Sequence, residues 1–495
     1  MEASPSACQE TSMPQLRPIP STLRLGVATA AYQIEGAVSA GGRVPSIWDT
    51  FSHTPGKVAN GDTGDVACDS YHRWEEDLGL IKGLGLDAYR LSIAWPRIIG
   101  GLGHAPTQEG LDYYKRLLDA LRDLDIAPVV TLYHWDLPQW LQDQGGWANR
   151  FTALQFGAYA EVLARELGDR VETWTTLNEP WVAAFLGHAS GVHAPGSTDG
   201  ATALAAAHHL NLAHGSAATA IRSVLPEAKI SVTHNLQVIR PALASDPAHQ
   251  AAAQRIRNLA NEIFLGPQFA GAYPEDLIDQ TVGVTDWGFV HDGDLVLARQ
   301  PLASLGVNYY YTDTVRPGVA GNLHQGASGW GQTSPWPGSE DVEFLRPLGP
   351  TTDMGWNQDP AGLTELLTTL AARFPGLPLE VTENGAAFPD TVDADGYVHD
   401  PQRIAYLRAH LHAVLDAIEA GAPVHGYFAW SLLDNFEWAL GYDKRFGLTR
   451  VDPVTQDRYI KASGQWYGAL GHTRQLEPLQ PGDPASIPGV GPRLD

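Results

Sequence analysis

Cysteine, basic residues and long apolar runs are all scarce in this sequence of 495 residues. Its two cysteines, Cys8 and Cys68, are too few for a disulfide framework or a cysteine-rich metal site. Lys and Arg number 32 against 56 Asp and Glu, so the formal net charge of -24 repels nucleic acid and anionic lipid surfaces. Because no apolar run reaches membrane-spanning length, we expect neither a nucleic-acid partner nor a membrane partner.

Signals for targeting, metals and cofactors are also few. Residues 1–20 carry Pro and acidic residues without a signal-peptide apolar run, which together with the low cysteine content predicts a cytoplasmic location. His208, His209 and His214 share a predicted helix but lack an HExxH pattern or a cysteine pair, so packing is the favoured interpretation. We therefore predict no metal and no cofactor, and assembly into homo-oligomers stays open.

The domain organisation follows from composition. Residues 1–20 and the Pro- and Gly-rich tail of residues 473–495 are predicted to be disordered. Between them, no Ser/Gly-rich linker or charge block separates two parts. The prediction is therefore one domain over residues 21–472.

Short apolar runs rich in Val, Ile and Tyr alternate with amphipathic helical segments along this domain, such as 110–124, 151–167, 201–224 and 401–420. Eight such strand–helix units favour an α/β fold, the (β/α)8 or TIM barrel with long loops after the strands. An open doubly wound sheet would give the same alternation. The predicted strands begin near Leu23, Asp87, Ile126, Val171, Lys229, Leu302, Pro378 and Val424.

Polar and aromatic side chains gather at the C-terminal ends of these predicted strands. A packing role would place aliphatic residues at most of these positions, whereas barrel enzymes collect their reactive groups there. The distribution therefore favours the closed barrel. The residues are Gln33, Glu35, Arg90, His134, Trp135, Asn178, Glu179, Asn308, Tyr310, Glu383, Asn384, Trp430, Glu437 and Trp438.

Glu179 and Glu383 end the fourth and seventh predicted strands, which face each other across a barrel mouth. Cleavage of a glycosidic bond needs a proton for the departing oxygen and negative charge beside the anomeric carbon, and two carboxyl groups supply both. An isolated strand-end glutamate is more often a surface or salt-bridge residue. The pairing of these two favours catalysis, with Arg90 keeping Glu383 ionised and burial keeping Glu179 protonated.

Ten motifs then follow one another along the chain. Any one could arise by chance, but ten in order are highly specific, and from about Gly26 to Tyr467 the chain closely resembles glycoside hydrolase family 1. The motifs are GVATAAYQIEGA, SIWDTF, CDSYHRWEED, YRLSIAWPRI, TLYHWDLPQWL, TLNEPW, FLGPQFAGAYP, GVNYY, VTENGAA and WSLLDNFEWALGYDKRFGL.

The resemblance implies a role for each matching residue. Glu179, in TLNEP, matches the acid/base glutamate, and Glu383, in TENG, matches the nucleophile. Arg90 and Tyr310 resemble residues that position the nucleophile, and Asn308 lies beside them in the catalytic set. Sugar binding is implied for Gln33, His134, Trp135, Asn178, Trp430, Glu437, Trp438 and Phe446.

The resemblance further implies a β-glucosidase that works by double displacement with retention, its two carboxyl groups about 5 to 5.5 Å apart. Its expected substrates are terminal β-D-glucosyl residues of oligosaccharides, including cello-oligosaccharides, and of aryl and alkyl β-glycosides; β-D-fucosyl and β-D-galactosyl residues are further candidates. A non-catalytic sugar-binding scaffold and a mainly transglycosylating enzyme stay open as alternatives.

Two features leave the preferred aglycone open. Leu440 stands where many relatives of this family carry glutamate or another polar or aromatic residue. The Gly-, Pro- and Trp-rich segment 321–345 is predicted to be a long loop over the barrel mouth.

The charge of Glu437 would repel the phosphate group of a phosphorylated sugar, so we expect an unphosphorylated substrate.

Overall fold

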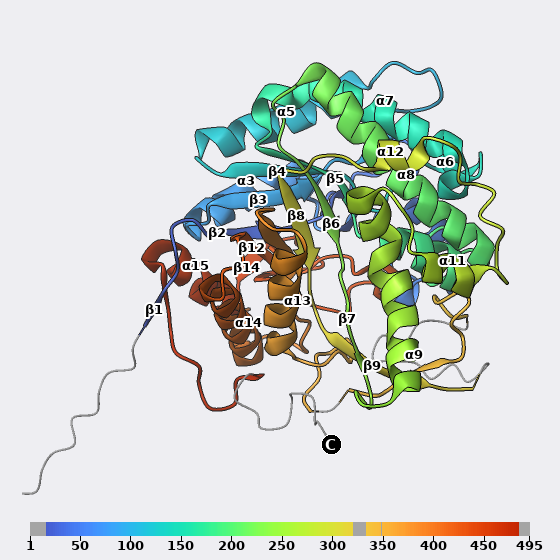
Figure 1. Ribbon diagram of the computed structural model, residues 1–495. Coiled ribbons are helices and arrows are strands. Elements are labelled where there is room, and N and C mark those ends of the chain that lie inside the picture. The colour runs from blue at the N-terminus through green and yellow to red at the C-terminus, as the bar shows by residue number, and fades with distance from the viewer. Residues whose placement is uncertain (1–15, 320–332, 348, 485–495) are drawn as a thin grey trace, which may run out of the picture.

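A closed barrel of eight parallel strands forms the centre of the computed structural model, which describes residues 16–319, 333–347 and 349–484 (Figure 1). Each strand pairs with its neighbour, and the last pairs with the first, Trp430 lying opposite Ala28. This confirms the barrel and excludes the open sheet. The strands are β2 (Arg24–Ala28), β3 (Ala88–Ser92), β4 (Ala127–Tyr133), β5 (Thr173–Asn178), β6 (Ile230–His234), β8 (Ser304–Asn308), β11 (Leu379–Asn384) and β12 (Val424–Trp430).

Burial on both faces explains the composition of these strands. All residues of β3, β5, β6, β8 and β11 are buried, because one face of each strand fills the barrel and the other meets the surrounding helices. Such burial favours apolar residues, although β5 (TWTTLN) carries three threonines along its length. Polar residues concentrate at their C-terminal ends, as in the TLN and TEN endings of β5 and β11.

Long helices surround the barrel (Figure 1), and four of them match the amphipathic segments expected from the sequence, α5, α7, α8 and α14. The α-helices of eight or more residues in the described part of the chain are α3 (Ser70–Gly83), α5 (Gln108–Asp123), α7 (Arg150–Leu167), α8 (Gly200–Val224), α9 (Pro247–Arg257), α13 (Pro360–Arg373), α14 (Pro401–Glu419) and α15 (Ala462–Thr473).

Capping residues fix where several of these helices begin. The Asn149 side chain accepts a hydrogen bond from the backbone amide of Phe151 at the start of α7. Asp359 accepts from the amide of Gly362 at the start of α13, whose first residue is Pro360. Each cap satisfies an amide that lacks a partner within its helix.

Further short elements lie in the loops. The short α-helices are α1 (Ala31–Ile34), α2 (Ile47–Ser52), α4 (Trp95–Ile98), α6 (Gln139–Gln142), α10 (Ile263–Leu265), α11 (Glu275–Thr281) and α12 (Asp294–Ala298). The 3-10 turns are η1 (Ala59–Gly61), η2 (Gly146–Ala148), η3 (Gly168–Arg170) and η7 (Trp438–Leu440), and the π-helices are η4 (Val182–Ser190), η5 (Asn258–Glu262) and η6 (Gly266–Ala270). Small sheets join β7 (Val238–Pro241) with β9 (Thr312–Pro317) and β10 (Val342–Phe344), and β13 (Thr449–Val451) with β14 (Arg458–Ile460).

The described parts of both chain ends pack on the barrel. β1 (Arg17–Pro18) pairs antiparallel with β15 (Gln475–Leu476), and the buried carboxylate of Asp483 accepts two hydrogen bonds from Arg408 of α14. Residues 16–20 and 473–484 therefore differ from the expected disorder, because backbone pairing and a buried ion pair hold them. The rest of the two predicted disordered ends, 1–15 and 485–495, lies outside the described residues, and the domain boundaries stay a prediction.

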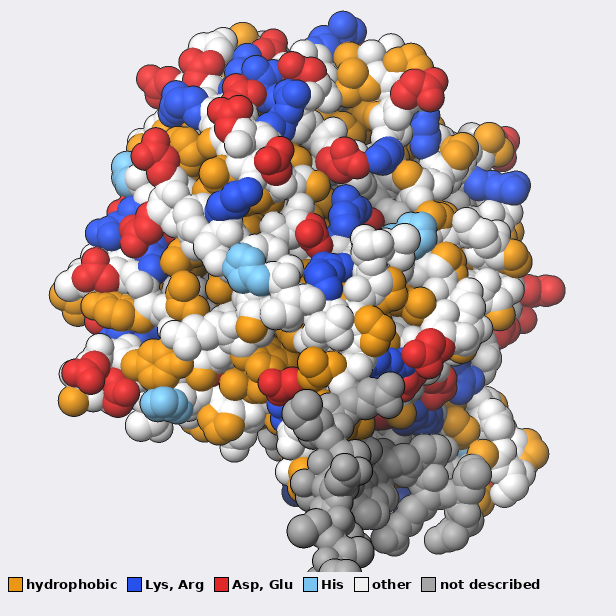
Figure 2. Space-filling model, turned by 90° about the vertical axis from the view of Figure 1, so that its left-hand side faces the viewer, with side chains coloured by type: hydrophobic (Ala, Val, Ile, Leu, Met, Phe, Trp, Pro, Cys, Tyr) orange, Lys and Arg blue, Asp and Glu red, His pale blue; other side chains and the backbone are white. Residues whose placement is uncertain are grey.

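Acidic and basic side chains are interspersed on the face shown in Figure 2. Pairs such as Arg165 with Glu161, one turn apart on α7, bring opposite charges within 2.6 Å. Such exposed pairs offset part of the repulsion that the net charge creates. In the described part of the chain, no helix has the length and apolarity needed to cross a membrane.

Candidate active site

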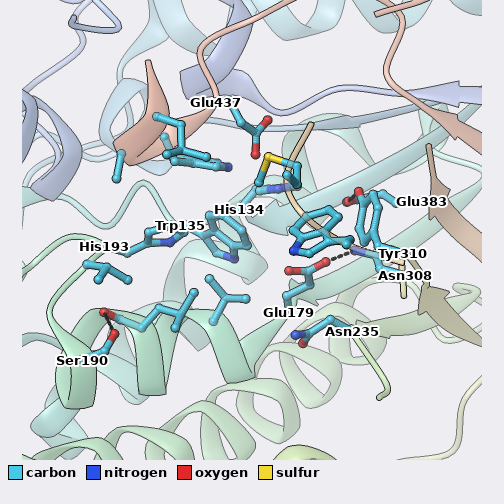
Figure 3. Close-up of a pocket in the computed structure, with 18 of the residues that line it drawn as sticks. His134, Trp135, Glu179, Ser190, His193, Asn235, Asn308, Tyr310, Glu383 and Glu437 are labelled. Atoms are coloured by element: carbon cyan, nitrogen blue, oxygen red, sulfur yellow. Dashed lines mark hydrogen bonds between the residues drawn. The ribbon is translucent and has the colours of Figure 1, made fainter. Parts of the chain in front are cut away.

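A cavity of about 680 Å³ opens at the C-terminal ends of the barrel strands (Figure 3). Its size lies in the range typical of small-molecule sites. The catalytic and sugar-binding residues assigned from the sequence all line it except Gln33, Arg90 and Asn178, which lie buried beside lining residues. Two further strand-end residues, Glu35 and Asn384, do not line the cavity and instead bond Arg97 and Tyr427. In Figure 3 the carboxylates of Glu179 and Glu437 enter the cavity from opposite sides, with Glu383 beside Tyr310.

Glu383, at the end of β11, accepts a hydrogen bond on each carboxylate oxygen. Arg90 of β3 donates from Nη1 to Oε1 over 2.6 Å, and the Tyr310 hydroxyl donates to Oε2 over 2.7 Å. Burial raises the pKa of Tyr310 well above its usual range, with Glu383 adding to the effect, so this hydroxyl keeps its proton. The two donors therefore occupy both oxygens of the Glu383 carboxyl group.

Glu179, directly after β5, has a different environment. Its oxygen Oε1 accepts a hydrogen bond of 2.6 Å from Asn308 of β8. Burial, followed by the nearby negative charge of Glu383, raises the pKa of Glu179 to about 8, while the bond from Asn308 opposes the rise. Glu179 therefore holds a proton near neutral pH, whereas Glu383 has a guanidinium partner.

A hydrogen-bond network beneath the cavity links these two environments. Arg90 donates from Nη2 to the side-chain oxygen of Asn178 over 2.6 Å, and Asn308 donates to the same oxygen over 3.0 Å. The amide nitrogen of Asn178 donates to Nε2 of His134 over 3.0 Å. Burial, with the positive charge of Arg90, lowers the pKa of His134 well below its usual range, so its ring is neutral and accepts this bond.

Glu437 lies in the loop after β12. Burial first, and then the charge of Glu383, raise the pKa of Glu437 to about 8, and a hydrogen bond from Gln33 opposes this. The amide of Gln33 also donates to the side-chain oxygen of Asn435 and to the carbonyl of Phe436, at 3.0 and 2.9 Å. These contacts fix the Gln33 side chain, from the first βα loop, against the eighth.

Aromatic rings form much of the remaining wall. The rings of Trp135 and Trp438 lie 4.6 Å apart, and the His134 ring stacks on Trp430 with centroids 5.9 Å apart. Phe446 lies close by, with its ring 6.1 Å from Tyr310. Trp135, Trp438 and Glu179 all have positive φ, a conformation that costs a non-glycine residue about 1 kcal/mol or more and that gathers at functional sites.

Gly385 allows the backbone after β11 to lie close to the end of β12. A Cβ on Gly385, in the TENG motif, would lie 1.9 Å from the carbonyl oxygen of Trp430. No larger residue fits there without moving the end of β11 away from β12. The glycine therefore keeps Glu383 and Trp430 on one wall of the cavity.

Several lining residues were not predicted. Asn235 directly follows β6, so the rule that strand ends carry site residues could have found it. Other lining residues, Lys57 and Trp356, lie in irregular loops, where no sequence period marks a contact. The π-helix η4, which follows β5, also contributes to the lining. Within the predicted overhanging loop 321–345, Thr333 lines the cavity, while residues 321–332 lie outside the described residues.

The three histidines of α8 contact protein groups. His208 lies between Asp294 and the Tyr273 hydroxyl, His209 bonds the carbonyl of Trp147, and His214 bonds Thr176. These contacts explain the histidines as buried packing residues. Across residues 16–319, 333–347 and 349–484, no group of three or more His, Cys, Asp or Glu could hold a metal ion.

A closed eight-stranded barrel with two unlike carboxyl groups in one sugar-sized cavity defines a glycoside hydrolase. Residues 16–476 match the model of glycosyl hydrolase family 1, and the chain belongs to this family. The predictions of the fold, of the family and of a retaining glycosidase are confirmed. The family match and the named relatives, which are glycosidases, give no support to the two alternatives, a non-catalytic scaffold and a mainly transglycosylating enzyme.

Named relatives cover almost the whole chain. It is 52% identical to a bifunctional β-D-glucosidase/β-D-fucosidase of Bifidobacterium breve, over 90% of this chain and 97% of the relative. Identity to β-glucosidase A of Thermotoga maritima is 43%, over 93% and 99%. The crystal structure of the psychrophilic β-glucosidase BglU of Micrococcus antarcticus is 45% identical, with a TM-score of 0.88 over 91% of this chain and 97% of that one.

Proposed function

We propose that this enzyme hydrolyses terminal β-D-glucosyl residues, with Glu383 as the nucleophile and Glu179 as the acid/base. The carrying observation is the contrast between the two carboxyl groups. Glu383 accepts from Arg90 and Tyr310, whereas burial raises the pKa of Glu179 to about 8. One group is thereby suited to attack and the other to proton donation.

In the first step an oxygen of Glu383 attacks the anomeric carbon, and the glycosidic C–O bond breaks. The bonding electron pair goes to the leaving oxygen, which takes the proton of Glu179. In the second step Glu179, now ionised, removes a proton from water as the water oxygen attacks the anomeric carbon. The ester bond to Glu383 breaks, its electron pair returns to the carboxylate, and the configuration is retained.

Tyr310, Arg90 and Asn308 support these steps through the carboxyl groups. Arg90 and Tyr310 hold both oxygens of Glu383 and stabilise its charge when the ester breaks. Asn308 donates a hydrogen bond to Glu179, which orients this side chain and stabilises its ionised form between the two steps. The expected carboxyl separation of about 5 to 5.5 Å belongs to this mechanism.

The glycone is proposed to lie among the predicted sugar-binding residues. In the described part of the chain, Oε1 of Gln33 and Nδ1 of His134 are buried without a hydrogen-bond partner. Unpaired buried polar atoms are costly, and a sugar hydroxyl can both donate and accept. Trp430 offers an apolar face to the C–H groups of the ring. Asn178, Trp135, Glu437, Trp438 and Phe446 complete this set.

The substrates follow from the relatives and from the cavity. The Bifidobacterium breve relative is named for β-D-glucosides and β-D-fucosides, and a Thermotoga neapolitana relative, 43% identical, is named 1,4-β-D-glucan glucohydrolase. We therefore expect aryl and alkyl β-glucosides and short cello-oligosaccharides as substrates, with β-fucosides next. Galactosides stay a further candidate from the sequence.

Hydrolysis of 4-nitrophenyl β-D-glucoside tests the proposal. Glu383→Ala should abolish turnover, and Glu179→Ala should lower it by roughly a hundredfold to ten-thousandfold. A dinitrophenyl glucoside has a leaving group that needs no proton. With this substrate, Glu179→Ala should lower the rate of the first step less than it does with 4-nitrophenyl β-D-glucoside. Glu380→Gln is the matched control, because Glu380 lies on the same strand but bonds Arg24. A wild-type enzyme inactive on β-glucosides, or an active Glu383→Ala, would overturn the proposal.

Cellular location and assembly stay predictions. The low cysteine content is part of the argument for a cytoplasmic location. Cys68 is a free, buried cysteine, with its sulfur 3.1 Å from the carbonyl oxygen of Asp434. Cell fractionation with an activity assay of each fraction tests the location. Light scattering of the purified enzyme tests for a homo-oligomer.

A further inference from the structure

Five charged side chains form a buried cluster behind the cavity wall. They do not line the cavity, and each side chain is at most 13% exposed. We call this group the Lys461 cluster. Its members are Asp390, Asp400, Arg403, Asp434 and Lys461.

Lys461 connects the loop that follows β11 with the loop that follows β12 and carries Glu437. Its Nζ donates to Asp390 over 2.5 Å and to Asp434 over 2.7 Å. Asp390 belongs to the loop after β11, the strand that ends with Glu383 and Asn384, and Asp434 belongs to the loop after β12. Lys461 itself precedes α15 and is fully buried.

Asp434 fastens both ends of the loop after β12. Its Oδ1 also accepts from the amide of Gly447 over 2.9 Å, and its own amide donates to the carbonyl of Thr449 over 2.9 Å. The next residue, Asn435, accepts the hydrogen bond from Gln33. Glu437 and Trp438 lie two and three residues further on. The ammonium group of Lys461 is therefore linked to these sugar-binding residues through a short stretch of backbone.

Arg403 closes the cluster on the other side. It donates to Asp390 over 3.1 Å, to the carbonyl of Arg445 over 2.7 Å, and to Asp400. Asp400 in turn accepts from the amide of Ser463, at the start of α15, over 2.8 Å. The same five charges therefore bind the loop after β11, the loop after β12 and the start of α15.

We propose that Lys461 and Asp434 are positioning residues that set Glu437 and Trp438 for the sugar before it binds. Apart from the short turn η7, the structure assigns no helix or strand to residues 431–448, so the loop depends on these contacts for its shape. A site whose side chains are already in place loses less free energy on binding. The inference rests on the proposed function, since it assigns the loop to sugar binding.

Binding of deoxynojirimycin separates this role from stability alone. This sugar-like inhibitor occupies a solved structure of the Thermotoga maritima β-glucosidase, 43% identical to this chain, with a TM-score of 0.86 over 93% of this chain and 100% of that one. Asp434→Asn keeps the side chain's shape but removes its charge, and Lys461→Met removes the ammonium group. Asp483→Asn is the matched control, since Asp483 forms a buried ion pair with Arg408 at the chain end.

Calorimetry should show deoxynojirimycin binding weakened on the order of tenfold or more in Asp434→Asn and Lys461→Met. KM for 4-nitrophenyl β-D-glucoside should rise more than kcat falls, because Glu179 and Glu383 are held by strands. Asp483→Asn should lower the unfolding temperature without changing either constant. Unchanged inhibitor affinity in folded Asp434→Asn, or its failure to fold, would overturn the inference; an inactive wild type would instead contradict the proposed function.

Discussion

Arg90 and Glu383 form an ion pair of 2.6 Å with side chains only 1% and 4% exposed. Arg90 lies on β3 and Glu383 on β11, so the contact crosses the interior of the barrel. The second arm of the same guanidinium holds Asn178. One side chain thereby holds Glu383 and also the network that reaches Asn308 and His134.

Replacement of Arg90 by methionine should lower kcat for 4-nitrophenyl β-D-glucoside by roughly a hundredfold or more, because a pre-positioned charge at the reacting group is lost. Arg90→Lys should recover little, since an ammonium group cannot bond Glu383 and Asn178 in the same planar geometry. Steady-state kinetics on folded variants checks both. Arg240→Met is a control, because Arg240 pairs with Asp359 and Glu365 and does not line the cavity. A kcat in Arg90→Met near that of the control would contradict the role.

The strand endings were predictable because polar residues there have no packing purpose, which is why Glu179, Glu383 and Arg90 stood out in the sequence. The hydrogen bond from Asn308 to Glu179 was not predictable. The resemblance placed Asn308 beside Arg90 and Tyr310, which position the nucleophile, and only the closed barrel brings Asn308 to Glu179. The contacts of Asp434 and Lys461 likewise depend on loops without a sequence period. Pro and Gly near residue 480 suggested disorder, but the Arg408–Asp483 pair is a tertiary contact that composition does not reveal.

The alkaline limb of activity should report Glu179. Since its pKa is raised to about 8 and the acid form donates the proton, kcat/KM should fall as pH rises through about 8. Asn308 stabilises the ionised carboxylate, so Asn308→Ala should raise this pKa further and move the limb to higher pH. Tyr310→Phe, which removes a donor from Glu383, should lower the rate and leave the alkaline limb in place. A limb that stays fixed in Asn308→Ala would contradict the assignment to Glu179.

Stability should depend on pH through the same group. Because the folded-state pKa of Glu179 is raised from 4.5 to about 8, its protonated form favours the fold, and this contribution is lost as pH rises from about 4.5 through 8. Glu179→Gln cannot ionise, so its free energy of unfolding should exceed that of the wild type by a few kcal/mol at pH 8.5 and by much less at pH 4.5. Thermal or denaturant unfolding at the two pH values measures this. The exposed Glu227→Gln should show no such pH-dependent gain; an equal gain at both pH values in Glu179→Gln would refute the linkage.

Leu440, two residues after Trp438 on the turn η7, gives the cavity an apolar side chain, and 38% of the residue is exposed. An apolar aglycone gains by covering this surface, whereas a second glucose presents hydroxyls to it. Leu440→Ser should therefore lower kcat/KM for octyl β-D-glucoside by roughly threefold to tenfold, with a smaller loss for cellobiose. The ratio of the two values is the measurement, because a change in overall activity cancels from it. Val454→Ser, at a residue 88% exposed that does not line the cavity, should leave the ratio unchanged. An unaltered ratio in Leu440→Ser would place aglycone selection in other residues of the wall, such as Lys57 or Trp356.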